Sequence, residues 1–252
     1  MRGLRVACSF LTRLPTANHL EFDAGDVGRS TPWFPVVGAL VGTVSAVVVW
    51  LAYALWPSEP LLCGLVATGV TVLFTGGLHQ DALADVADGM GGGHDRESSL
   101  TIMRDSQIGT FGGLALVLSI GLRVTALASL VHQGISLLWV VGAACLARWS
   151  AVALARALPY ARTSEAGLGR AVTDYVGWRE MVFAGGVAVA GAYCCFDGYH
   201  GLALVLCVAI TWLTGSWFRR RLGGITGDGL GFVVEANEIA ILLLGTAVGV
   251  SR

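Results

Sequence analysis

Long hydrophobic runs, free of charge except at two internal arginines, dominate this chain. A helix needs about 20 apolar residues, at about 1.5 Å each, to cross the roughly 30 Å hydrocarbon core of a bilayer. Some runs reach that length and the shorter ones need flanking residues, so we predict an all-α polytopic membrane bundle of six or seven transmembrane helices, one domain over residues 1–252. The runs are Val36–Trp56, Leu61–Leu78, Phe111–Val131 across Arg123, Ile135–Ala155 across Arg148, Met181–Phe196, Gly198–Phe218 and Ile239–Val250.

Composition supports a membrane location and excludes other common classes. Charged residues make up 13% of the 252 residues, against about 25% in an average soluble protein, and the mean hydropathy is +0.70. Such a chain has too little polar surface for a water-soluble globule and is too hydrophobic to remain disordered. Its net charge of −1 argues against a nucleic-acid-binding surface.

The distribution of arginines predicts the orientation. All 16 basic residues are arginine, and a seven-span topology that begins in the cytoplasm places 13 of them inside. The outer loops are then Pro57–Pro60, His132–Gly134 and the turn at Asp197, which contain no arginine. This is the positive-inside pattern, and it predicts a multi-pass protein of the cytoplasmic membrane. Most acidic residues fall on the same side, so we expect the chemistry at the cytoplasmic face.

Cysteines and span glycines have a structural interpretation. None of the six cysteines forms a CxxC motif or a Cys/His cluster, so we expect buried, unpaired side chains rather than disulfides or a zinc site. Gly38 and Gly42 have the small-xxx-small spacing that lets membrane helices approach closely.

Three aspartates in the segment Gly76–Gly89 are the first candidates for chemistry. Asp81, Asp85 and Asp88 are spaced i, i+4 and i+7, which places them within about 60° of one another on a helix face. Grouped carboxylates repel one another where the dielectric constant is low. A divalent cation, Mg²⁺ or Mn²⁺, is the simplest compensation for hard oxygen ligands. The alternative is a solvated acidic helix end, which would normally also contain glutamates and basic residues.

A second segment, residues 89–112, begins with several glycines. These predict a turned loop and give only weak support for a phosphate cradle. Arg104 has the planar guanidinium group that clamps phosphate, and Asp105 could complete a metal shell. A plain ion pair between Arg104 and Asp105 is the alternative.

A third segment, Gly223–Gly231, contains Asp228 and leads into the last span, where Glu235 and Glu238 follow. Carboxylates that enter a membrane are costly and usually functional; the alternative is a flexible linker capped by solvated acids. Arg148, inside a span, is interpreted as functional on the same ground. Arg123 could equally be a snorkelling residue.

Carboxylates, a metal and arginines on one face suit a substrate that bears phosphate or diphosphate. The sequence contains neither the GxxxxGK[ST] motif of P-loop enzymes nor a GxSxG nucleophile motif. These residues therefore predict an intramembrane transferase for a nucleotide-activated substrate, and they leave the acceptor open.

The chain resembles the cobalamin synthase family over almost its whole length. The departures are Ala82, where the family commonly has glycine, and Gln80, where an apolar residue is usual. The motifs that carry the resemblance are Ser9–Pro15, Phe34–Gly38, Gly76–Gly89, Ile102–Gly113, Tyr160–Arg162 with Gly167–Gly169, and Gly223–Gly231 with Glu235 and Glu238.

The resemblance implies a Mg²⁺-dependent transferase of late cobalamin synthesis. A ribose hydroxyl of α-ribazole, or of its 5′-phosphate, would attack the cobinamide-side phosphorus of adenosylcobinamide-GDP, and GMP would leave. The chain would act in the lipid bilayer, and a homo-oligomer is compatible with the sequence. In the implied roles, Asp81, Asp85 and Asp88 bind Mg²⁺, Asp105 or Asp228 assists the metal or acts as base, Arg104, Arg148 and Arg162 neutralise phosphate, and Arg13 borders the site.

Two other functions remain. A CDP-alcohol phosphotransferase-like enzyme also uses an intramembrane aspartate cluster, but its DGxxAR element is absent from Asp81–Asp85, which lacks that glycine and that arginine. A transporter would be expected to show internal repeats and polar residues spread through the midplane. In this sequence the carboxylates instead cluster on one face, and no repeat is evident.

Overall fold

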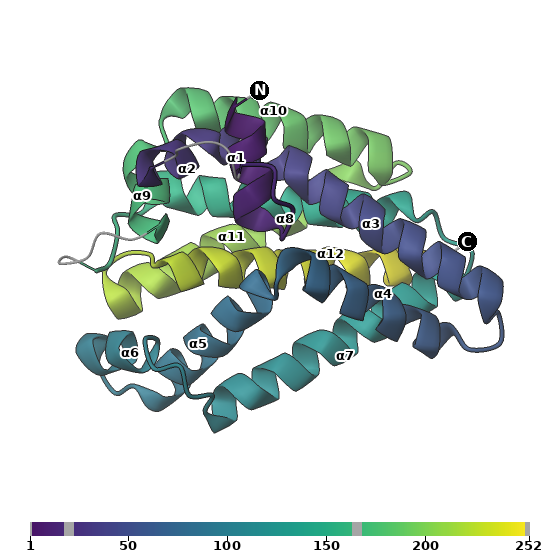
Figure 1. Ribbon diagram of the computed structural model, residues 1–252, viewed down its shortest axis with the longest axis horizontal. Coiled ribbons are helices and arrows are strands. Elements are labelled where there is room, and N and C mark those ends of the chain that lie inside the picture. Colours follow the sequence, from purple (N-terminus) through teal and green to yellow (C-terminus); the bar gives the residue numbers. More distant parts are fainter. Residues whose placement is uncertain (1, 18–22, 163–167, 250–252) are drawn as a thin grey trace.

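The computed structural model describes residues 2–17, 23–162 and 168–249. Over these ranges the regular structure is helical, and one isolated parallel bridge joins Tyr160 to Ile225. This confirms the all-α prediction (Figure 1). The elements are α1 (Arg2–Leu11), α2 (Ala24–Ser30), η1 (Thr31–Trp33), α3 (Phe34–Leu55), α4 (Pro60–Thr75), α5 (Leu78–Gly92), α6 (Arg96–Ile102), α7 (Thr110–His132), α8 (Leu138–Ala157), α9 (Leu168–Tyr175), α10 (Trp178–Cys195), α11 (His200–Leu222) and α12 (Gly227–Gly249).

Each predicted hydrophobic run overlaps one helix, and these helices are α3, α4, α7, α8, α10, α11 and α12. In the part of the chain described, five segments are long and apolar enough to cross a membrane, or six if α4 and α5 form one bent span. The protein is therefore a multi-pass membrane protein.

Three predicted boundaries were wrong. The second run extended to Leu78, but α4 ends at Thr75 and α5 leaves it at 90°, because Gly76 and Gly77 adopt φ values of 70° and 72°, which suit glycine. The glycines at 89–92 do not form a loop, since α5 continues through Gly92. The last helix begins at Gly227, ahead of Glu235 and Glu238, where the final span was expected to start.

Helix α8 is the most enclosed of the apolar helices and lies against α3, α10 and α12 (Figure 1). Gly38 faces the backbone of Ala144 and Gly42 faces the backbone of Val140, so a side chain at either glycine would overlap α8. This confirms the predicted close packing. Gly186, another span glycine, faces open space.

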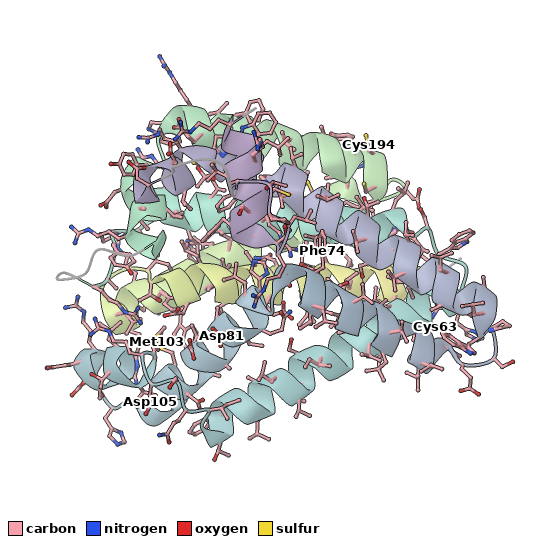
Figure 2. The ribbon with its side chains drawn as sticks, in the orientation of Figure 1. Cys63, Phe74, Asp81, Met103, Asp105 and Cys194 are labelled. Atoms are coloured by element: carbon pink, nitrogen blue, oxygen red, sulfur yellow. The ribbon has the colours of Figure 1, made fainter. Side chains whose placement is uncertain are left out.

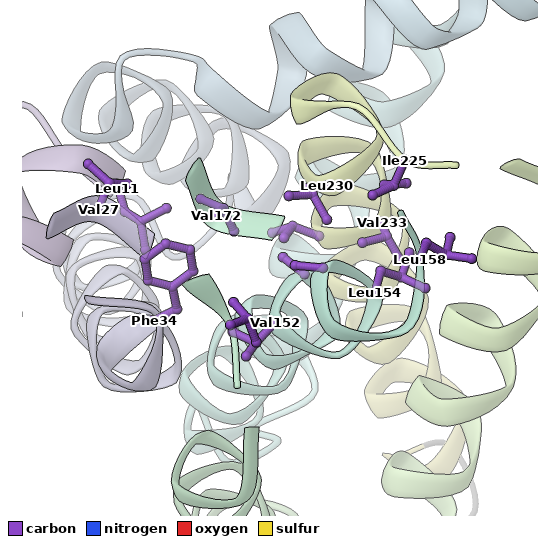
Figure 3. Packing of buried hydrophobic residues seen from close by; sticks show 14 of the residues in the cluster. Leu11, Val27, Phe34, Val152, Leu154, Leu158, Val172, Ile225, Leu230 and Val233 are labelled. Atoms are coloured by element: carbon purple, nitrogen blue, oxygen red, sulfur yellow. The ribbon is translucent and has the colours of Figure 1, made fainter. Parts of the chain in front are cut away.

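The hydrophobic core is divided into two clusters. One includes Phe34, Val152 and Leu230 and lies at the end that carries α1 and α9 (Figure 3). The other includes Leu127 and Trp139. Arg148 of α8 and Glu235 and Glu238 of α12 lie where the two clusters meet. These charged residues therefore separate two apolar layers.

All six cysteines are free, as predicted, and five of them are buried. Cys194 is the exception: its side chain is exposed on α10 (Figure 2). The expectation of burial was wrong at this position only.

Candidate active site

The N-terminal segment places Arg13 at the bend between α4 and α5. The Arg13 backbone N–H donates to the carbonyl of Phe74 at 2.8 Å, and the Arg13 guanidinium group lies against Gly76. A side chain at residue 76 would displace that group. Arg13 thus lies beside the start of α5, the helix that carries Asp81 (Figure 2).

The structure divides the predicted trio of aspartates. Asp81 and Asp85 face Asp228 of α12, whereas Asp88 faces the N-terminus of α7. Both Asp88 carboxylate oxygens accept backbone hydrogen bonds, from the N–H of Gly109 at 2.7 Å and from that of Gly112 at 2.8 Å. These N–H groups have no partner inside α7, so Asp88 caps that helix. Within the described residues, no three His, Cys, Asp or Glu side chains are grouped closely enough to hold a metal ion.

Asp228 lies at the first turn of α12 and is positioned by a short backbone pairing. The Ile225 N–H donates to the Pro159 carbonyl at 2.9 Å, and the Ala161 N–H donates to the Ile225 carbonyl at 2.8 Å. This pairing places the Arg162 guanidinium 3.1 Å from the Asp228 carboxylate.

The carboxylates of α5 and α12 form one negative group. The partly buried Asp85 carboxyl lies within the electrostatic reach of the negative charges of Asp228, Asp81 and Asp88 and of the positive charge of Arg162. Arg162 is therefore the principal cation that faces the aspartates of the two helices.

A cavity of about 240 Å³ opens between α1, α3, α5, α8, α9 and α12. Its walls are mostly apolar and include Phe10, Phe34 and Leu230. Its charged lining residues are Asp81, Asp228 and Arg148, and the buried His79 also lines it. Asp81 and Asp228, 147 positions apart in the sequence, thus share one wall.

A second, polar cleft of about 600 Å³ lies beside α6. It is lined by Arg96, Arg104 and Arg162 together with Asp95 and Glu97. Asp95 caps α6, and the hydrogen bonds that its carboxylate accepts from the Ser98 backbone N–H and hydroxyl hold its pKa below the usual range. Because Arg162 lines the cleft and also pairs with Asp228, this ion pair joins cleft and cavity.

Asp105 differs from Asp228 in its surroundings. Its carboxylate accepts a hydrogen bond of 3.0 Å from the Gln107 N–H in its own exposed loop, below α5 in Figure 2. It lines neither the cavity nor the cleft. Of the two predicted bases, the geometry therefore places only Asp228 at the cavity.

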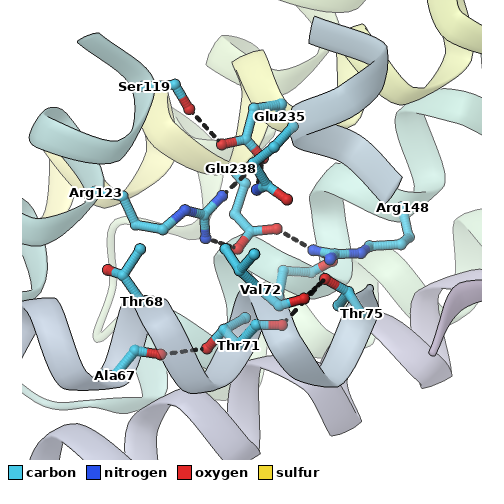
Figure 4. A network of polar contacts seen from close by, with 12 residues as sticks. Ala67, Thr68, Thr71, Val72, Thr75, Ser119, Arg123, Arg148, Glu235 and Glu238 are labelled. Carbon is cyan, nitrogen blue, oxygen red and sulfur yellow. Dashed lines mark hydrogen bonds and ion pairs between the residues drawn. The ribbon is translucent and has the colours of Figure 1, made fainter. Parts of the chain in front are cut away.

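A buried charge network lies deeper in the bundle (Figure 4). Glu238 accepts from both Arg123 and Arg148, and Glu235 accepts from Arg123 at 2.9 Å. Ser119 also donates to Glu235, at 2.6 Å. These charged side chains are at most 5% exposed. Arg148 is thus held by Glu238 at the edge of the cavity rather than directed freely toward substrate, and Arg123 does not snorkel.

Comparison with known proteins identifies the family of this chain. The family model described as cobalamin-5-phosphate synthase matches residues 3–246. The chain belongs to the cobalamin-5-phosphate synthase family. It is therefore a membrane-embedded enzyme of the transferase class. No solved structure matches the chain.

Relatives named adenosylcobinamide-GDP ribazoletransferase cover nearly the whole chain. The protein from Ralstonia pickettii is 34% identical over 96% of this chain and 93% of its own length. The one from Bradyrhizobium diazoefficiens is 38% identical, over 99% and 95% respectively. The one from Escherichia coli K12 is 37% identical, over 93% and 95%.

Two departures from the pattern expected for a cobalamin synthase have a packing explanation. The Ala82 methyl group occupies the space that a side chain on Gly231 of α12 would need. The glycine at this contact between α5 and α12 is therefore on α12. Gln80 donates to Glu235 at 2.8 Å and joins the charge network. Among the resemblance motifs, Gly167 lies outside the described residues.

The charge network was only partly predicted. The spans contain two arginines, Arg123 and Arg148, and two glutamates, Glu235 and Glu238. The equal number of positive and negative charges was the sequence feature that indicated pairing between them. The sequence left Arg123 open between a functional and a snorkelling residue and gave Gln80 no role, because each pairs with a residue more than 100 positions away.

We expect Asp88→Ala to destabilise the protein by about 1–2 kcal/mol, because the α7 N-terminus loses its cap. Asp88→Asn should lose less than Asp88→Ala, because its single amide oxygen can still accept from one of the two backbone N–H groups, whereas its NH2 group faces the other. Thermal unfolding in detergent measures both, and transferase activity is measured alongside. If Asp88 were instead an essential metal ligand, Asp88→Asn would be stable and inactive.

Proposed function

We propose that this protein is a Mg²⁺-dependent transferase that joins adenosylcobinamide-GDP to α-ribazole or its 5′-phosphate. In this reaction a ribose hydroxyl oxygen forms a bond to the cobinamide-side phosphorus. The bond from that phosphorus to the bridging oxygen of GMP breaks, GMP leaves with the electron pair, and the hydroxyl proton passes to a base. The observation that carries the proposal is the shared cavity wall of Asp81 and Asp228, with Arg162 beside it.

The donor chemistry of this wall fits Mg²⁺. Asp81 and Asp228 line the cavity, and Asp85 lies one turn further along α5; the three offer hard carboxylate oxygens on two facing helices, with Arg162 as the counter-charge that faces them. They do not form a closed coordination shell by themselves. An incomplete protein shell is typical of Mg²⁺ sites, in which the ion is usually held by one or two carboxylates, water and substrate phosphates. When bound with the diphosphate, the ion would neutralise charge on the phosphate oxygens.

The remaining roles follow from position. Asp228 is the preferred base, because it lines the cavity and Asp105 does not. The hydrogen bond from Arg162 holds the Asp228 carboxylate in the cavity wall, which Asp81 also lines. Arg162 and Arg104 line the cleft and are placed to bind phosphate oxygens there. Arg148 contributes its positive charge from the network, where Glu238 fixes it.

We also propose that the site faces the cytoplasm from the inner membrane. Helices α5, α6 and α9 and the start of α12 lie at one end of the molecule (Figure 1). The arginines Arg219, Arg220 and Arg221 end α11, which directly precedes α12. The positive-inside rule assigns such an end to the cytoplasm, where nucleotide substrates are available.

The test is release of labelled GMP from adenosylcobinamide-GDP by membranes that contain the protein. We expect release to require both α-ribazole and Mg²⁺, to stop when EDTA removes the metal, and to return when Mg²⁺ is added in excess. Membranes without the protein are the control. Release that persists in EDTA would exclude the metal, and release without any acceptor would indicate hydrolysis instead of transfer.

A further inference from the structure

We propose that the apolar cavity binds the aromatic base of the acceptor and that the arginine-lined cleft holds the nucleotide of the donor. This assignment rests on the function proposed above and specifies which substrate each space receives. The cavity, at about 240 Å³, is smaller than the roughly 300–1,000 Å³ of a pocket for a drug-sized ligand. One bicyclic base with its ribose matches that size, whereas a corrin ring joined to a nucleotide far exceeds it.

The walls of the cavity match the chemistry of the acceptor base. Phe10 and Phe34 stack with ring centroids 5.8 Å apart and planes 22° from parallel, and both line the space with Ala151, Val172 and Leu230. The base of α-ribazole is 5,6-dimethylbenzimidazole, which is flat, carries two methyl groups and has few polar atoms. Guanine has several donors and acceptors, and these would lose water without replacement against such walls.

The charged groups place the reacting atoms between the two spaces. With the base against the aromatic pair, the ribose hydroxyls would meet Asp81 and Asp228, since these carboxylates line the same cavity. Arg162 then marks the junction, because it binds Asp228 and also lines the cleft. The cleft supplies Arg96 and Arg104 for phosphate oxygens and exposed carboxylates for a polar base. The phosphorus under attack would thus lie at the junction.

A cavity-filling variant tests the assignment. We expect Ala151→Leu to raise the KM for α-ribazole at least tenfold and to change the KM for adenosylcobinamide-GDP less than twofold, because Ala151 lines the cavity. Ala153→Leu is the matched control: it makes the same change on the same helix, but Ala153 lines a separate apolar groove with Trp149 and Trp212. Both KM values should stay within twofold of wild type in this control.

The unaltered enzyme provides an independent measurement in case Ala151→Leu does not fold. Free 5,6-dimethylbenzimidazole, which lacks the attacking hydroxyl, should inhibit competitively against α-ribazole and not against the donor, and adenine should not inhibit. A raised donor KM in Ala151→Leu, or inhibition that is competitive against the donor, would overturn the assignment and leave the proposed function standing. Absence of GMP release by the wild-type protein would overturn both.

Discussion

Replacement of Asp81 by asparagine is expected to lower the rate of GMP release by a factor on the order of 10²–10³, the loss typical when one preorganised electrostatic group is removed from an active site. Asp81 is exposed and lines the cavity that Asp228 also lines. Asparagine keeps the size of the side chain and removes the negative charge that would hold the proposed Mg²⁺ ion on the diphosphate. Purified protein in liposomes, assayed at saturating Mg²⁺, measures the change.

The control for Asp81→Asn is the same substitution at Asp174, which is exposed on α9 and pairs with Arg170 four residues earlier. It should cost less than twofold in rate. Asp228→Asn should resemble Asp81→Asn, and Asp105→Asn should cost much less because that carboxylate faces its own loop. A wild-type rate in Asp81→Asn would contradict the proposal that the diphosphate binds beside Asp81.

Periodicity and composition predicted the helical bundle because span length and lack of charge are local properties of the sequence. The errors arose where backbone conformation, rather than hydrophobicity, decides where a helix ends. Gly76 and Gly77 end α4 through their left-handed backbone, whereas Gly89, Gly91 and Gly92 remain helical. Glycine alone does not distinguish these two cases, since it permits both.

The sequence indicated which residue types belong to the site better than it indicated which residues contact one another there. Spacing grouped Asp81, Asp85 and Asp88, since all three occupy one helix. It gave no indication that Asp88 would meet backbone N–H groups 21 and 24 positions away. Nor did it indicate that Asp228 would complete the group through a pairing with Arg162, 66 positions distant. Such contacts depend on how helices pack, and a single sequence does not record that.

The buried network should be the most sensitive point for stability. We expect Glu238→Gln to lower the free energy of unfolding by about 3–5 kcal/mol, the usual cost of breaking a buried ion pair from one side. Glu238 is 4% exposed and accepts from both Arg123 and Arg148. Its loss leaves two guanidinium groups with the single charge of Glu235, inside apolar layers where unpaired charge is costly. Thermal unfolding in detergent and the yield of folded protein measure the effect.

The double variant Arg148→Met/Glu238→Gln separates charge balance from packing. It removes one charge of each sign and leaves the Arg123–Glu235 pair, whose closest atoms are 2.9 Å apart. We therefore expect it to be more stable than Glu238→Gln alone, with a coupling energy between the two sites of about 1–3 kcal/mol. Glu59→Gln, at an exposed position before α4, should stay within about 0.5 kcal/mol of wild type. Strictly additive losses in the double variant would show that Arg148 and Glu238 do not depend on each other, and the network would then be two independent contacts.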